Sequence, residues 1–105
     1  MVVPAVEPRV KANIVLLGGF VNRIALPETQ GINYISRIRI PTLMLNGKYD
    51  MAFPLETAVR PAFRLLGTPA KDKKLVVYDT DHFVPPKELI RESLDFLDRY
   101  LKPVR

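Results

Sequence analysis

The stretch of sequence that decides the fold is residues 40–50, which read IPTLMLNGKYD. Its centre, Thr42–Leu45, shows no alternation of apolar and polar side chains, which is typical of a strand with both faces covered. Two similar blocks, Ile14–Leu17 and Leu75–Tyr78, begin 28 residues before it and 33 residues after it. Such spacings leave room for a crossover helix and far exceed the loop of a hairpin. The pattern therefore predicts three parallel strands.

A helix is predicted between the second and third strands. Leu55–Leu66 carries apolar residues close to a helical period. Pro61 interrupts this stretch, so we expect a break or kink near Arg60. Gly67 follows as the expected C-terminal cap.

A clearer helix follows the third strand. It is expected to begin at Pro86 and to be stopped by Pro103. Its apolar stripe has spacings of four, three and four residues, and consists of Ile90, Leu94, Leu97 and Leu101. The expected fold is therefore α/β, a three-stranded parallel sheet with flanking helices and right-handed crossovers, in a single domain over residues 1–105.

One local alternative competes with this fold after the second strand. Asn46-Gly47 is a strong signal for a two-residue hairpin turn, and Tyr49, Met51 and Phe53 alternate behind it. A hairpin would make Lys48–Phe53 a strand rather than a loop. Pro54 and the lack of β-branched residues favour the loop.

Composition excludes several classes of protein. The 48% hydrophobic and 26% charged residues are ordinary for a globular chain and argue against disorder. The absence of cysteine excludes disulfides, thiol catalysis and cysteine-ligated zinc, and the single histidine, His82, excludes a multi-histidine metal site. No apolar run approaches the ~18 residues of a membrane span, and the start lacks the layout of a signal peptide. We expect a cytoplasmic protein without a metal or other cofactor.

The charge balance does not point to a particular partner. The net charge is +5, but the basic residues are spread from Arg9 to Arg105. The densest group, Lys71, Lys73 and Lys74, contains Asp72. Because no basic stripe is interleaved with aromatic residues, we expect neither nucleic acid nor a membrane as a partner.

Two polar residues stand where ligands and catalytic groups collect in open α/β sheets, beyond the carboxyl ends of the strands. Asp50 lies five residues after the second strand, and His82 lies four residues after the third. A carboxylate holds an imidazole in one tautomer and stabilises its protonated form. Asp79 and Asp81 are the alternative partners of His82. Asp81 is adjacent to it in sequence, and neighbouring side chains on extended backbone point apart, so Asp50 is the better candidate. A polar surface pair without a function is the simpler interpretation.

These residues lie in segments that resemble α/β-hydrolases. Ile40–Asp50 with Phe53-Pro54 resembles the strand that carries the family's acid, and Asp79–Phe83 before a terminal helix resembles its histidine segment. Glu7–Ala12 leading into Gly18-Gly19-Phe20 is similar to the stretch after the nucleophile helix in dienelactone-hydrolase-like and prolyl-oligopeptidase-like members. The resemblance implies that Asp50 is the triad acid and His82 the triad base.

The sequence departs from this family at the nucleophile. No Gly-x-Ser-x-Gly turn precedes Ile14–Leu17, and the two serines, Ser36 and Ser93, stand elsewhere. The chain thus resembles the C-terminal third of a hydrolase, without nucleophile elbow or oxyanion hole. We expect a fragment of an esterase- or peptidase-type acyl hydrolase that is inactive alone, so whether the chain is an enzyme stays open. The alternatives are a non-catalytic, self-associating α/β domain and a minimal esterase that uses Ser36 or a bound water.

The first strand is also expected to be a sheet edge. Between Ala12 and Phe20 the only polar side chain is Asn13, and neither proline nor charge interrupts the run. We expect a homodimer in which the Ile14–Leu17 strands of two copies pair antiparallel. The alternative partner is a complementing N-terminal hydrolase segment.

Overall fold

A computed structural model describes residues 2–20 and 30–101 of the chain. Its centre is a sheet of three parallel strands in the order β1-β2-β3, which are Asn13–Leu16, Thr42–Gly47 and Lys73–Tyr78. Three α-helices, α1, α2 and α3, span Val3–Val6, Arg60–Leu65 and Pro86–Tyr100. Short 3-10 or π turns, η2 to η5, span Gly31–Asn33, Ile35–Arg37, Leu55–Val59 and Ala70–Asp72. The predicted α/β fold with a three-stranded parallel sheet is confirmed.

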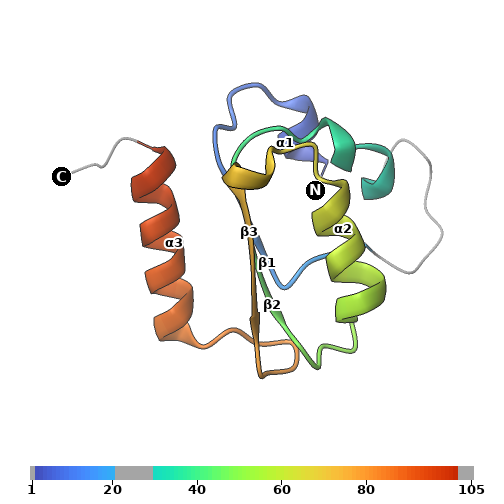
Figure 1. Ribbon diagram of the computed structural model, residues 1–105, viewed down its shortest axis with the longest axis vertical. Coiled ribbons are helices and arrows are strands. Elements are labelled where there is room, and N and C mark those ends of the chain that lie inside the picture. Colours follow the sequence, from blue (N-terminus) through green and yellow to red (C-terminus); the bar gives the residue numbers. More distant parts are fainter. Residues whose placement is uncertain (1, 21–29, 102–105) are drawn as a thin grey trace.

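The sheet is covered on both faces, with α2 on one side and α3 on the other (Figure 1). Every residue of the central strand β2 is buried, which explains its continuous apolar sequence. Its side chains alternate between two clusters. Met44 packs with residues of η3, η4 and α2, whereas Leu43 and Leu45 pack with Val84 and Phe96 on the α3 side. The core therefore consists of two layers with β2 between them.

The helix predicted for Leu55–Leu66 forms in two parts. The first part is a π turn, in which the N–H groups of Ala58 and Val59 both donate to the carbonyl of Pro54, at 2.9 and 3.2 Å. This turn leads directly into α2 at Arg60. Pro61 then lies in the first turn of α2, where its missing N–H has no cost. The expected break near Arg60 is this change of helix type.

The predicted C-terminal cap at Gly67 is wrong. The chain leaves α2 at Leu66, whose ψ of 129° is already extended, and none of the described glycines has a positive φ. Gly67 is needed for a different reason, because a Cβ there would lie 2.2 Å from the carbonyl oxygen of Ser36. Close backbone approach, rather than a left-handed turn, explains this glycine.

The last helix forms as predicted, but its buried face differs from the predicted stripe. Phe96 is buried, and Leu89, Leu97 and Tyr100 pack around it against the sheet. In contrast, Ile90 and Leu94 are 59% and 57% exposed. The helix presents an aromatic-rich face to the sheet and leaves most of its aliphatic stripe uncovered. The predicted stop at Pro103 lies outside the described residues.

The hairpin alternative is not formed. Lys48–Phe53 is a turn followed by bends. The N–H of Lys48 binds the carbonyl of Tyr78 at 2.8 Å, and that of Tyr49 binds the carbonyl of Thr80 at 2.9 Å. Because these donors bind the exit of β3, they are not available to pair back with β2.

Within residues 2–20 and 30–101, no helix is long and apolar enough to cross a membrane.

Candidate active site

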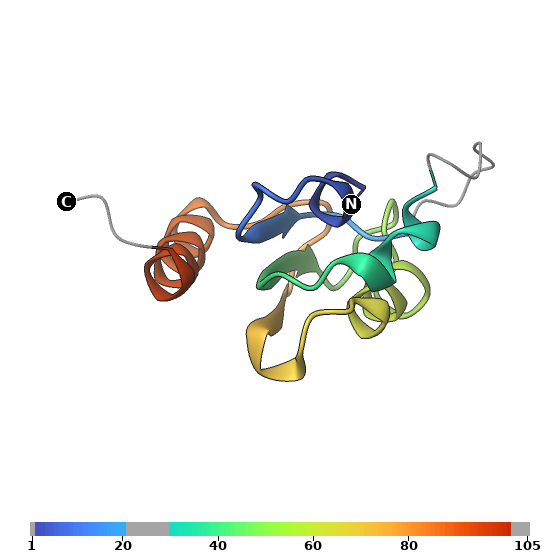
Figure 2. The same cartoon turned by 90° about the horizontal axis from the view of Figure 1, so that it is seen from above.

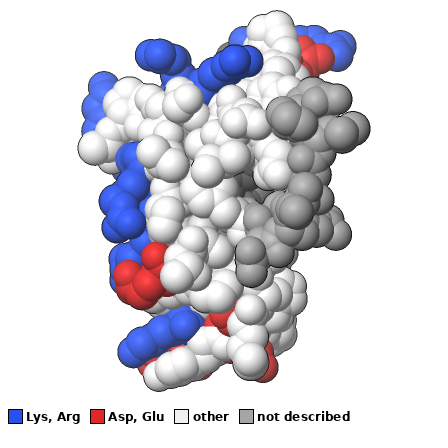
Figure 3. All heavy atoms as spheres, turned by 90° about the vertical axis from the view of Figure 1, so that its right-hand side faces the viewer, with Lys and Arg blue, Asp and Glu red and all other residues white. Residues whose placement is uncertain are grey.

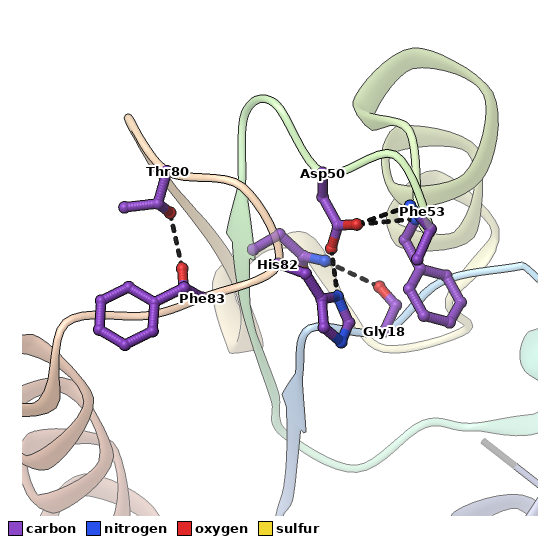
Figure 4. A network of polar contacts seen from close by, with 8 residues as sticks. Gly18, Asp50, Phe53, Thr80, His82 and Phe83 are labelled. Carbon is purple, nitrogen blue, oxygen red and sulfur yellow. Dashed lines mark hydrogen bonds and ion pairs between the residues drawn. The ribbon is translucent and has the colours of Figure 1, made fainter.

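The structure brings Asp50 and His82 together at the carboxyl end of the sheet (Figure 4). Asp50 stands on the loop after β2, and His82 on the loop after β3. Nδ1 of His82 lies 2.7 Å from Oδ2 of Asp50, so the two form a hydrogen bond. The Asp50 side chain is fully buried, whereas the His82 side chain is 54% exposed. A buried acid therefore holds a base that faces the solvent.

The loop after β2 fixes the Asp50 carboxylate on its other side. Its Oδ1 accepts hydrogen bonds from the backbone N–H groups of Ala52 and Phe53, at 2.8 and 3.1 Å. The ring of Phe53 stacks on the His82 imidazole, with centroids 6.1 Å apart and an interplanar angle of 22°. Both carboxylate oxygens are thus occupied, and the imidazole is held at its edge and its face.

These contacts keep Asp50 ionised. Burial by itself raises the pKa of its carboxyl, but hydrogen bonds from His82 and from the backbone of Phe53 and Ala52 outweigh burial, and the pKa falls below its ordinary value of 3.8. A carboxylate only accepts hydrogen bonds, so Nδ1 of His82 must donate. In the neutral imidazole the lone pair then belongs to Nε2, which is free to take a proton.

The two loops of the site lie in direct contact at Gly47, the last residue of β2. A Cβ at this position would lie 1.8 Å from the carbonyl oxygen of Asp81 and 2.6 Å from that of Thr80. The Thr80 hydroxyl in turn donates to the carbonyl of Phe83, at 2.6 Å, across the residue that carries the imidazole. The His82 loop therefore packs against Gly47, and only glycine at this position leaves room for it.

Sequence reasoning assigned Gly47 to a turn signal and missed this role. It also missed Asn46, whose amide donates to the carbonyl of Gly18 at 2.9 Å and ties the exit of β1 to β2. One feature of the sequence could have indicated these roles: Asn46 and Gly47 lie between a buried strand and the candidate acid Asp50.

The remaining candidate residues do not join the pair. His82 bonds Asp50 rather than Asp79 or Asp81, both of which are exposed. Ser36 lies in η3, at the amino end of β2, and the six residues of that strand separate it from the site by about 20 Å. Ser93 lies within α3, two turns after its start. Among the described residues, no three histidine, cysteine or acidic side chains gather into a possible metal site.

Comparison with known proteins gives matches at the level of structure. No protein-family model and no curated protein matches the sequence. A cold-adapted esterase from an Arctic intertidal metagenomic library matches in its zinc-bound structure, with a TM-score of 0.75 and 26% identity over 95% of this chain and 43% of the esterase. Its native structure matches with a TM-score of 0.71 at the same identity and coverage.

A second protein shares the fold at lower identity. TT1662 from Thermus thermophilus has a TM-score of 0.76 and 17% identity, over 97% of this chain and 49% of its own length. The chain therefore has an α/β-hydrolase-like fold, and the esterase supports a relationship to hydrolases. It spans less than half the length of either of these proteins.

The lowered pKa of Asp50 predicts how stability depends on pH. A carboxylate with a folded pKa below its unfolded value stabilises the fold above that value, and this contribution is lost as pH falls through the folded pKa. At pH 7, Asp50→Asn should lower the free energy of unfolding by about 1.5–3 kcal/mol, the range for hydrogen bonds to a charged group. The difference from wild type should shrink below pH 3.8.

Urea unfolding of both proteins at pH 7, 5 and 3 measures this difference. Asp79→Asn is the matched control, because it removes an exposed carboxylate from the neighbouring loop. A destabilisation by Asp50→Asn that is equal at all three pH values would contradict the prediction.

Proposed function

We propose that Asp50 and His82 are the acid and base of an acyl hydrolase of the esterase or peptidase type. The observation that carries the proposal is the 2.7 Å hydrogen bond from a half-exposed imidazole to a buried carboxylate at the carboxyl ends of neighbouring parallel strands. This is the edge at which α/β folds place their sites. The structural likeness to an esterase adds support.

The proposed chemistry follows from the tautomer. Nε2 of His82 accepts the proton of an attacking hydroxyl as its oxygen bonds the acyl carbon. The tetrahedral intermediate then collapses by breaking the bond to the leaving group, which takes the proton back from the imidazolium. Asp50 orients the imidazole and stabilises the imidazolium that forms. The nucleophile that the family implies is not supplied by Ser36 or Ser93. We therefore propose that the two residues work with a nucleophile from outside the described residues, and that the described part is inactive as a hydrolase alone.

A second candidate function is a self-associating α/β domain without catalysis. It is favoured by one observation, the uncovered aliphatic residues Ile90 and Leu94 on α3. The two candidates differ in whether His82 can activate a hydroxyl group.

Acyl transfer to an added alcohol tests the proposed function. With p-nitrophenyl acetate as donor and trifluoroethanol as acceptor, the chain should accelerate formation of trifluoroethyl acetate, and His82→Ala should abolish this acceleration. Asp50→Asn should reduce it by about tenfold or more, because the imidazole then loses its orienting carboxylate. Gas chromatography of the ester product measures the transfer.

The single histidine makes this assay specific, since no other imidazole contributes. Asp79→Asn is again the control and should transfer at the wild-type rate. Equal transfer by wild type and His82→Ala would contradict the proposed function and leave the non-catalytic domain as the better account.

A further inference from the structure

The two edges of the sheet differ in how well they are protected against pairing. The β3 edge begins with Lys73 and Lys74, and the hollow between it and α2 is also lined by Arg60 and Arg64. Figure 3 shows Lys and Arg gathered along one border of the α2 face. Charged side chains of this kind keep strand edges from pairing with another chain, and two such edges would repel each other.

The β1 edge carries no such protection. Asn13 is the only polar side chain between Ala12 and Phe20. The N–H groups of Asn13 and Leu17 bind the carbonyls of Pro41 and Leu45 on the β2 side, at 2.9 and 2.8 Å. Since N–H groups alternate in direction along a strand, those of Ile14 and Leu16 point away from β2, towards the free edge. In the described part of the chain, β1 pairs with β2 alone.

Apolar side chains continue this edge on the α3 side of the sheet. Ile14 packs in the cluster beneath α3, and Leu16, two residues on, shares its face and is 45% exposed. In the described part of the chain β1 has a strand on one side only, so part of its apolar surface is covered, at Ile14, and part is exposed, at Leu16. Leu16 is thus an apolar side chain at an unpaired edge.

One flank of α3 extends the same surface. Glu92 pairs with Lys74 at 3.1 Å, so the flank that carries Glu92 faces β3. At 100° per residue, the apolar residues lie on the opposite flank of α3. In Figure 2, which looks along α3, β1 and β3 lie at opposite ends of the sheet beside this helix, so the flank opposite Glu92 is the one on the β1 side. We call it the apolar flank, and its residues are Ile90, Leu94, Leu97 and Leu101. Three of these four side chains are 38–59% exposed.

We propose that this surface binds a second copy of the chain. A twofold axis through the sheet pairs the β1 strands of two copies antiparallel and joins the sheets into one of six strands. The N–H groups of Ile14 and Leu16 then find carbonyl partners, and the apolar flanks of the two α3 helices face each other across the joined strands. The cationic β3 edges become the outer edges, as far apart as the assembly allows. This arrangement does not depend on the catalytic role of His82.

Sedimentation of the full chain at about 10 µM tests the proposal, and should give a dimer. Leu16→Lys and Leu94→Lys, each at a half-exposed position, should weaken dimerisation by about tenfold or more, since each buries a charge at the joined surface. Leu65→Lys is the matched control. Leu65 is 49% exposed but lies on α2, so this variant should sediment as wild type.

Hydrogen exchange separates edge pairing from other contacts. The amides of Ile14 and Leu16 should gain protection with rising protein concentration, and should lose it in Leu16→Lys. Circular dichroism establishes that each variant is folded. A folded wild-type chain that is monomeric with these two amides unprotected would overturn the proposal, and so would a dimer that Leu16→Lys and Leu94→Lys leave unchanged.

Discussion

The chain of 105 residues alone is expected to hydrolyse p-nitrophenyl acetate with a kcat about a million-fold below that of a hydrolase with a complete triad. An oriented imidazole assists proton transfer, but it needs an activated nucleophile and preorganised donors for the oxyanion to give the full rate. We expect neither serine to supply the nucleophile, because Ser36 lies at the opposite end of β2 and Ser93 lies within α3. A fluorophosphonate probe, which labels activated serines, should therefore leave the chain unlabelled.

Three substitutions test this expectation. Ser36→Ala and Ser93→Ala should leave the small residual rate unchanged, whereas His82→Ala should remove whatever part the imidazole provides. Mass spectrometry of the probe-treated protein reports labelling directly. A substantial rate that disappears in Ser36→Ala, together with a covalent adduct on Ser36, would show that the chain is a complete esterase.

The central sheet was predictable from the sequence because its signals are strong and local. Thr42–Leu45 is buried on both faces, so selection for packing leaves a continuous apolar block that no loop or exposed strand would carry. The spacing of the three blocks then fixed the parallel order. The meeting of Asp50 and His82 followed from topology, since parallel neighbours deliver their carboxyl ends to the same edge of the sheet.

The orientation of the last helix was not predictable from periodicity alone. The aliphatic stripe around Ile90 and Leu94 and the face around Leu89 and Phe96 are both apolar, and they lie about a third of a turn apart. Only the position of the sheet decides which of them is covered. A helix with two apolar faces and one sheet beneath it leaves a surface uncovered, and that surface became visible only in three dimensions.

Gly47→Ala should disrupt the Asp50–His82 pair although it changes neither residue. The new methyl group would lie 1.8 Å from the carbonyl oxygen of Asp81. The obstacle is backbone rather than a flexible side chain, so the loop that carries His82 must move or β2 must distort. We expect the free energy of unfolding to fall by about 3 kcal/mol, the upper range for overpacking. The proton between Nδ1 and Oδ2 should lose its downfield resonance in the NMR spectrum.

Gly18→Ala is the appropriate control, because it introduces the same methyl group after a neighbouring strand. There the nearest atom is Cγ1 of Val15, at 2.7 Å, a side-chain methyl that can move. This variant should retain the downfield proton and lose less stability than Gly47→Ala. If Gly47→Ala instead kept both the resonance and the wild-type stability, the His82 loop would not rest on β2 as described. The hydrogen bond to Asp50 would then have to be maintained by the Asp50 loop alone, through Ala52 and Phe53.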